Sequence, residues 1–191
     1  MKSRLASLAS YHGQDIHHEN CFACGVKNPH RLAVPSTFDE STGEVRFVYT
    51  LEKSHEGAPG HSHGGVLASI LDEAQGVLCH HLGYFVMTDY FTIKYHKATP
   101  LYVPLHIRAY LSAARRRRLY TRATICLENA DLLVESAIRW YILPEKLLVR
   151  KFHFDERSEK AQHMIQVFEA NRLRAREIRR RLKKNQQGSH Q

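Results

Sequence analysis

The chain shows two hydrophobic periods that divide much of it into strands and one long helix. Residues 44–51 carry apolar side chains at every second position, which is the pattern of a strand with one buried face. The strand period returns over residues 91–95, 103–111, 119–127 and 132–140. Between them, residues 65–82 have a helical spacing that ends at Gly83, with one apolar face made of Leu67, Ile70, Leu71, Ala74 and Leu78.

This order of elements predicts an α+β fold. Thr99-Pro100 and Asn129-Ala130-Asp131 are typical turn sequences between the later strands. A run of strands joined by turns favours an antiparallel sheet. Because a helix with one apolar face must bury it, we expect the helix to pack on one face of that sheet.

The pattern changes after Pro144. From Ser158 onward the sequence predicts a second helix, with Ser158 as its N-cap. The helix carries a stripe of mostly apolar residues. We expect this stripe to dock on the protein's own core or on a dimer partner. A coiled coil is less favoured, because the stripe spans only about three heptads and is poor in leucine. Residues 186–191 are expected to be disordered. The stripe recurs at spacings of three and four: Ala161, Met164, Phe168, Asn171, Ala175, Ile178 and Leu182.

Composition limits the class of protein. The 191 residues are 43% hydrophobic, enough for one domain of ordinary size with residues left over. No run of 18 apolar residues occurs, so no membrane span is expected, and the start of the chain is too polar for a secretory signal. Four cysteines in a chain of this length do not indicate a disulfide scaffold, so we expect a reducing cytoplasm.

The net charge of +9 is unevenly distributed. Residues 1–144 hold 15 Lys and Arg against 13 Asp and Glu, whereas residues 145–191 hold 13 against 6. The basic character therefore belongs mostly to the C-terminal part. That asymmetry indicates an appended function and argues against a nucleic-acid-binding core.

A glycine pair and a carboxylate are the main chemical candidates. Gly64 and Gly65 open the apolar helix, where backbone N–H groups and the helix dipole favour an anion. Asp72 follows two apolar residues, where a surface helix would not normally carry a charge. An oxyanion-binding helix end and a half-buried carboxylate are the two parts needed to hydrolyse an activated acyl group.

The spacing of these groups constrains the assembly. Gly64 and Asp72 are eight residues apart, about 12 Å along a helix axis. One aspartate side chain does not span that distance. If both groups act on one carbonyl, they come more plausibly from two copies of the chain, which predicts a homodimer or a dimer of dimers with a shared site.

The run from His63 to Asp72 resembles the signature of the hotdog-fold thioesterases, of the 4-hydroxybenzoyl-CoA and phenylacetate-degradation types. That signature is His-Gly-Gly, an apolar helix, and an acid nine residues after the histidine. The loop Gly57-Ala58-Pro59-Gly60 matches the usual approach to it, and Asn20–Gly25 with Asn28-Pro29 is similar to the N-terminal element of one subgroup. The strand pattern from Tyr95 to Leu105 also agrees.

The resemblance implies a hotdog fold, in which an antiparallel sheet wraps around one long central helix. It covers residues 17–144, and residues 145–191 are then a basic helical C-terminal extension with a disordered end. The implied activity is hydrolysis of an acyl-CoA or acyl-carrier-protein thioester, without a cofactor. Arg31 and Gly76 depart from the subgroup pattern, which more often has glycine at the first position and, in some relatives, Thr or Ser at the second.

The resemblance selects Asp72 as the catalytic carboxylate, because it is the acid nine residues after His63. Glu73 lies about 100° further around the helix and cannot share the direction of Asp72. Asp72 is either a general base that activates water or a nucleophile that forms a transient anhydride; the alternative is an aspartate that only caps or forms an ion pair at a dimer interface. Gly64 is the expected oxyanion donor, beside Gly65. His63 orients the loop or the thioester carbonyl, or else makes a structural hydrogen bond.

Other residues complete the expected site. Ser69 binds substrate or Asp72, or back-bonds to its own helical turn. Lys94, Lys97 and the Arg115–Arg118 run are candidates for the phosphates of coenzyme A. The aromatic residues that we expect to line the acyl pocket are Tyr84, Phe85 and Tyr90.

A metal is not expected from the sequence. Cys21 and Cys24, with His17 and His18 nearby, have the residue types of four zinc ligands. One such pair without a second spaced pair is a weak zinc signal.

Three classes of function remain open. The first is a thioester hydrolase, and the second is a hotdog protein that binds acyl groups without hydrolysis or catalyses a polyketide-type reaction. The third is an adaptor that binds nucleic acid or an anionic membrane through the basic extension.

Overall fold

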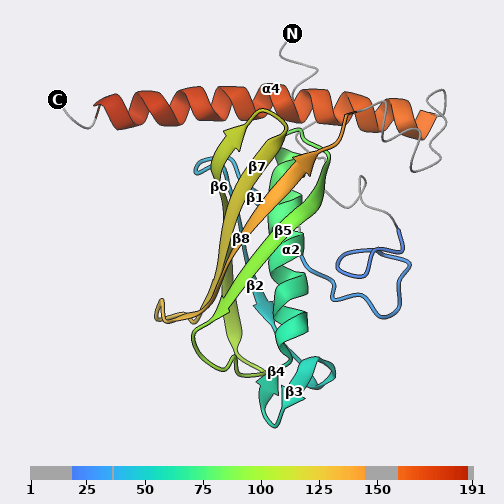
Figure 1. Cartoon of the computed structure of the whole chain (residues 1–191), viewed down its shortest axis with the longest axis vertical. Coiled ribbons are helices and arrows are strands. Elements are labelled where there is room, and N and C mark those ends of the chain that lie inside the picture. The colour runs from blue at the N-terminus through green and yellow to red at the C-terminus, as the bar shows by residue number, and fades with distance from the viewer. Residues whose placement is uncertain (1–18, 36, 145–158, 189–191) are drawn as a thin grey trace.

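The computed structural model of the chain describes residues 19–35, 37–144 and 159–188. A six-stranded sheet of order β1-β2-β6-β7-β8-β5 curves around the helix α2 (Gly64–His81), and every neighbouring pair is antiparallel (Figure 1). This arrangement confirms the expected α+β hotdog architecture. Its strands are β1 (Phe38–Asp39), β2 (Glu44–Thr50), β5 (Val86–Tyr95), β6 (Pro104–Arg115), β7 (Arg118–Cys126) and β8 (Leu132–Ile142).

A small element precedes α2. The 3-10 helix η2 (Lys53–His55) is followed by the paired strands β3 (Glu56–Ala58) and β4 (His61–Ser62), which lead directly into the start of α2. The first strand residues of β5 extend the predicted strand toward the N-terminus. The sequence predicted a strand only from residue 91, because residues 86–90 do not alternate in polarity.

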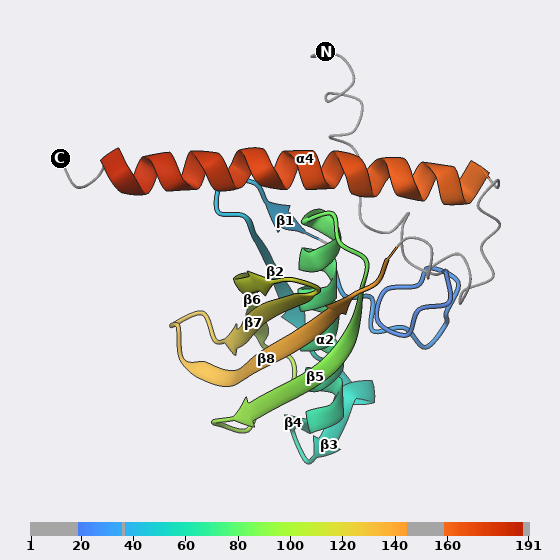
Figure 2. The ribbon, with the colours of Figure 1, turned by 45° about the horizontal axis from the view of Figure 1, so that its top comes forward.

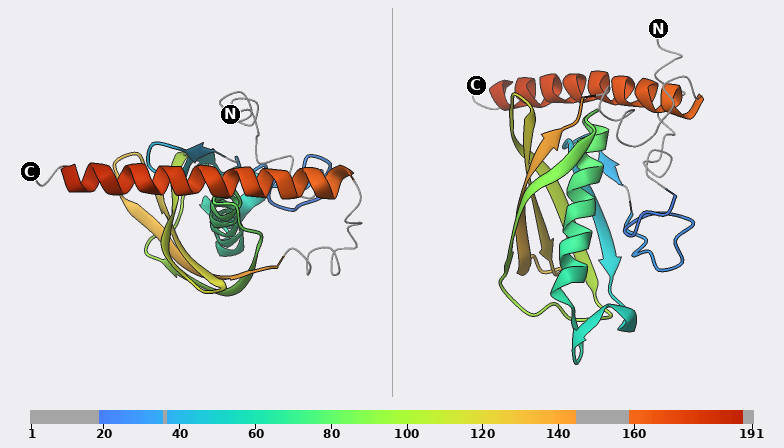
Figure 3. Two further views of the ribbon diagram at one scale, coloured as in Figure 1. Left: turned by 90° about the horizontal axis from the view of Figure 1, so that it is seen from above. Right: turned by 45° about the vertical axis from the view of Figure 1, so that its right-hand side comes forward.

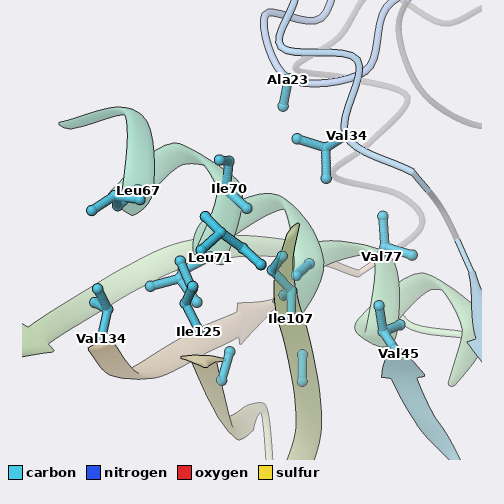
Figure 4. Packing of buried hydrophobic residues seen from close by; sticks show 14 of the residues in the cluster. Ala23, Val34, Val45, Leu67, Ile70, Leu71, Val77, Ile107, Ile125 and Val134 are labelled. Atoms are coloured by element: carbon cyan, nitrogen blue, oxygen red, sulfur yellow. The ribbon is translucent and has the colours of Figure 1, made fainter. Parts of the chain in front are cut away.

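The apolar face of α2 forms the core against the concave face of the sheet. All five residues predicted for that face are buried, with at most 2% exposure. Figure 4 shows Ile107, Ile125 and Val134 of the sheet below α2. Above α2 it shows Ala23 and Val34 of the N-terminal segment, by which we mean residues 19–35. Each fully buried leucine or isoleucine contributes about 1.5–3 kcal/mol relative to an exposed one, so this face is the main force that places α2.

A buried polar network also ties α2 to the sheet. The amide of Gln75, which has no exposed surface, donates to the Ser136 hydroxyl at 2.8 Å. The Thr121 hydroxyl donates to Gln75 Oε1 at 2.7 Å and accepts from Trp140 Nε1 at 2.7 Å. Because these polar groups find their hydrogen bonds inside the core, they fix the rotation of α2 as well as its position.

The helix α4 (Glu159–Gly188) lies across one end of the sheet and of α2 (Figures 2 and 3). Its buried residues are Val167, Phe168, Asn171, Ala175 and Ile178, so four of the predicted stripe residues are buried. The Asn171 side-chain amide donates to the carbonyl of His80 at 3.1 Å. Of the two docking surfaces considered for this stripe, the described residues use the protein's own core.

The close contact of α4 with the end of α2 depends on a glycine. Gly83 has a φ of +79°, and a Cβ there would lie 2.5 Å from the backbone nitrogen of Arg172. The helix α4 continues to Gly188, so the expectation of disorder from residue 186 onward is wrong for residues 186–188. Some of the expectations from the sequence concern positions outside the described residues. They are the domain boundary between residues 144 and 145, the N-cap Ser158, and the histidines His17 and His18. Neither α2 nor α4, within the described residues, has the length and apolarity to cross a lipid bilayer.

Candidate functional site

The start of α2 presents one unused backbone donor. His63 is the N-cap, with extended backbone angles, and its Nδ1 accepts from the Gly65 N–H at 2.9 Å. The next N–H, of Val66, donates to the His63 carbonyl at 3.0 Å. Within the described parts of the chain no group accepts from the Gly64 N–H. The cap thus uses Gly65 and leaves Gly64 as the donor available to an anion at this helix end.

Both glycines also permit close packing. A Cβ at Gly64 would lie 3.2 Å from the hydroxyl oxygen of Tyr95, and one at Gly65 would lie 3.0 Å from Nδ1 of His63. The Tyr95 hydroxyl donates to the Gly64 carbonyl at 2.8 Å, which joins β5 to the start of α2. The pair therefore serves packing, and that role is compatible with anion binding at the same place.

Asp72 lies in the middle of α2 and is only partly exposed. The hydroxyl of Thr88 on β5 donates to Asp72 Oδ1 at 2.9 Å. Burial raises the pKa of Asp72 and the nearby Glu73 charge raises it further, against the opposing hydrogen bond of Thr88. Among the described residues no group donates to Oδ2, so one carboxylate oxygen is oriented and the other is left for a water or a substrate.

The two parts of the site do not meet within one chain. β5 runs beside α2, with Tyr95 at Gly64 and Thr88 at Asp72, so these residues mark two separate points on the helix. One stripe along α2 stays at least partly exposed, while the opposite face of the helix, which carries Leu67, Ile70 and Leu71, is buried. The members of the exposed stripe are Gly65, Ser69, Asp72 and Gly76.

The strand beside that stripe is an edge of the sheet. β5 pairs only with β8, and its other side faces no described strand. Its exposed side chains include Met87 at 47%, Tyr90 at 56% and Tyr95 at 48%. A ten-residue edge with large apolar side chains is an open template for pairing with another strand.

The remaining predicted residues are distributed unevenly. Ser69 lies near the helix start, but its hydroxyl donates to the Gly65 carbonyl at 2.9 Å, which is the back-bond considered for it. Lys94 is 3.8 Å from Glu135 on the outer side of the sheet, and Lys97 is 2.6 Å from Asp131. The structure thus brings His63, Gly64, Gly65 and Ser69 together and places both lysines in surface ion pairs.

The aromatic and arginine candidates also have structural contacts. Phe85 packs edge-on against Phe168 of α4, with ring centres 5.7 Å apart, and Arg172 lies over Tyr84. Tyr90 lies under the guanidinium of Arg139. At the first position of β7, Arg118 is 3.3 Å from Asp89.

Sequence reasoning did not assign Thr88 and Tyr95 to the site, although they contact its two halves. Each reaches α2 only because β5 folds back along it. The only sequence signal was the position of Tyr95 at the end of the strand predicted after the helix, whereas Thr88 lies before the start of that predicted strand. That signal does not say which strand residue faces which turn of α2.

Comparisons with known proteins agree with the fold. The family model described as the thioesterase superfamily matches residues 59–134. A crystal structure described as a thioesterase superfamily protein is 26% identical, covers 74% of each chain and has a TM-score of 0.60. No curated protein matches the sequence significantly.

Two more distant structures share the fold. A hypothetical thioesterase from Streptococcus pneumoniae, solved with coenzyme A, is 22% identical over 52% of this chain and 81% of that one, with a TM-score of 0.51. The PaaI protein of the phenylacetic acid degradation operon of E. coli is 16% identical over 53% of this chain and 74% of that one, also with a TM-score of 0.51.

Proposed function

We propose that the protein is an acyl-CoA thioesterase that acts as a homodimer, because the chain has a hotdog fold and its residues 59–134 match the thioesterase-superfamily model. The observation that carries the proposal is the state of Asp72: half-buried on α2, held through one oxygen by Thr88, with a raised pKa. The related structure with coenzyme A supports CoA as the carrier. An acyl-carrier protein remains the alternative carrier.

In the proposed reaction the Gly64 N–H donates to the thioester oxygen as negative charge develops on it. Asp72 either takes a proton from the water that attacks the carbonyl carbon or attacks that carbon itself. In the first route the tetrahedral intermediate expels the CoA thiolate and leaves the free acid. In the second, the thiolate leaves first and water then hydrolyses the acyl-aspartyl anhydride.

A two-fold arrangement joins the two halves of the site. If β5 pairs antiparallel with β5 of a second copy, the sheet continues across the dimer and the exposed stripes of the two α2 helices face one another. A two-fold axis that passes midway between Gly64 and Asp72 then sets Asp72 against Gly64 of the partner subunit. The unpaired edge and its exposed apolar side chains support this assembly.

In this proposal His63 is the N-cap that fixes the loop. Substrate binding by Ser69, Lys94 and Lys97 remains a prediction, and so does a cytoplasmic location. Two arginines of α4 contact the domain itself, Arg172 at the Gly83 carbonyl and Arg174 at Glu40. We therefore do not extend the proposal to nucleic acid or membranes.

The test is thiol release from a panel of acyl-CoAs that range from acetyl to long-chain and aromatic. We expect hydrolysis of at least one member, and loss of it in Asp72→Asn. Glu128→Gln, which makes the same change at an exposed carboxylate in the β7–β8 turn, should keep the wild-type rate. Binding of acyl-CoA without thiol release would instead favour the non-hydrolytic class.

A further inference from the structure

A cluster of metal-binding side chains lies outside the proposed active site. The sulfur atoms of Cys21 and Cys24 and a carboxylate oxygen of Glu73 all lie within 4.8 Å of one another. Cys24 is 7% exposed and Glu73 is 8% exposed, whereas Cys21 is partly exposed. The cysteines belong to the N-terminal segment beside α2, and Glu73 belongs to α2 (Figure 3). The fold therefore joins ligands that are far apart in the sequence.

A tight turn presents the two thiols together. The Gly25 N–H donates to the Cys21 carbonyl at 2.9 Å and closes the Cys21–Gly25 turn. A Cβ at Gly25 would lie 2.2 Å from the Cys21 nitrogen and 2.6 Å from the Glu19 carbonyl oxygen, so only glycine fits there. This turn keeps both sulfurs on one side of the segment.

The segment is folded on itself and joined to the rest of the domain. The Leu32 N–H donates to the Phe22 carbonyl and the Val34 N–H to the Ala23 carbonyl, each at 3.0 Å, and the Tyr49 hydroxyl of β2 donates to the Leu32 carbonyl. Ala23 and Val34 are buried over α2 (Figure 4). The two cysteines are consequently held in place over the helix turn that carries Glu73, and little rearrangement is needed to bring three ligand atoms onto one ion.

From this geometry we propose that Cys21, Cys24 and Glu73 bind a zinc ion. Zinc accepts thiolate and carboxylate ligands in a tetrahedron, with Zn–S near 2.3 Å and Zn–O near 2.0–2.2 Å, so its ligand atoms are roughly 3.5–3.8 Å apart. Ligand atoms that lie within 4.8 Å of one another need to approach by only about 1 Å to reach that spacing. The two sulfurs argue against calcium and magnesium, which take oxygen ligands.

Binding releases the two thiol protons and leaves three anionic ligands around one dication. The fourth position is open to water or to another ligand. Because Glu73 and Asp72 point about 100° apart on α2, the ion lies off the side of the helix that carries the catalytic candidate. Its role is to clamp the N-terminal segment onto α2, which predicts a metal-dependent stability.

The test is metal analysis of the full chain, purified without chelators or an affinity metal. We expect about one zinc per chain. Replacement by Co²⁺ should give the thiolate-to-metal absorption of a tetrahedral site. Glu73→Gln, which keeps the shape of the side chain, should weaken Co²⁺ binding by at least about tenfold, the lower limit seen even for indirect ligand contacts. Cys24→Ser should abolish the absorption.

Two variants serve as matched controls. Cys126→Ser removes a thiol elsewhere, and Asp72→Asn removes the adjacent carboxylate; both should keep the metal and the spectrum. A chelator should lower the melting temperature of the wild type and leave that of Cys24→Ser unchanged. Wild-type protein without metal and without Co²⁺ absorption would overturn the proposal, and so would a disulfide between Cys21 and Cys24 in the purified protein. The wild-type and Glu73→Gln titrations decide the matter even if Cys24→Ser does not fold.

Discussion

Replacing Thr121 by valine removes one hydroxyl and with it two buried hydrogen bonds. Thr121 is 1% exposed and stands between Gln75 Oε1 and Trp140 Nε1, each 2.7 Å away. Valine has nearly the same shape, so the change leaves packing almost intact but strands a buried acceptor and a buried donor. Each stranded group costs about 1–3 kcal/mol. We therefore expect Thr121→Val to lower the free energy of unfolding by about 2–6 kcal/mol, summed over the two groups.

The measurement is urea unfolding at fixed protein concentration. Trp140 is the only tryptophan of the chain and belongs to the network, so its fluorescence reports the transition directly. Thr124→Val makes the same substitution on the same strand, at a partly exposed position, and should change stability by no more than about 0.5 kcal/mol. Equal effects of the two variants would refute the assignment of stability to this network. The triple variant Gln75→Met, Thr121→Val and Ser136→Ala should recover part of the loss, because the stranded acceptor of Gln75 is then gone and its former partner Ser136 is not stranded in turn.

Three further predictions concern other parts of the molecule. Thr88→Val removes the hydrogen bond that orients Asp72. A hydrogen bond to a charged group is worth about 1.5 kcal/mol, so its loss should lower kcat at least tenfold with little change in KM. A change confined to KM would contradict the positioning role of Thr88. Phe168→Ala should weaken the docking of α4 by about 3–5 kcal/mol, so α4 amides should exchange before the sheet in hydrogen-exchange measurements, and unchanged protection would speak against the docking account. Hydrogen bonds from the neighbouring hydroxyls of Ser41 and Thr42 lower the pKa of Asp39 to about 2, below its value in the unfolded chain. The stability advantage of wild type over Asp39→Asn should therefore be complete above about pH 4 and disappear as the pH falls toward about 2. An NMR titration midpoint of Asp39 near 3.8 would exclude this contribution to stability.

Periodicity predicted the elements that bury a single face. The five apolar residues assigned to one side of α2 are the ones that the sheet covers. Four residues of the stripe of α4 are buried against the protein's own core, one of the two surfaces considered for it. The Gly64–Asp72 separation also follows from helix geometry alone. These features are local, because they depend on residues within a few turns of each other.

The contacts around the site could not be predicted in the same way. Thr88 meets Asp72, and Glu73 meets the two cysteines, only after the sheet order and the path of the N-terminal segment are set. Lys94 and Lys97 were chosen for their charge, but the neighbouring strands supply carboxylates to both. Long-range pairing decides such contacts, and a single sequence contains no local signal for it.

A mixing experiment tests the shared site most directly. Asp72→Asn removes the carboxylate, and Gly64→Pro removes the backbone donor at the first helical position, where proline is well tolerated. Gly64→Ala keeps the N–H and adds the Cβ near Tyr95, so it controls for the steric change. Gly64→Pro should lose about 10²–10³ in rate relative to Gly64→Ala.

Each of the two variants alone should be inactive toward a substrate found in the acyl-CoA panel. After they are unfolded and refolded together in equal amounts, half of the dimers contain one chain of each kind. In every mixed dimer, one site combines an intact Asp72 with an intact Gly64 of the other subunit, so activity should return to about one quarter of wild type. A mixture that stays as inactive as the separate variants, although mixed dimers have formed, would contradict a catalytic site built from two chains.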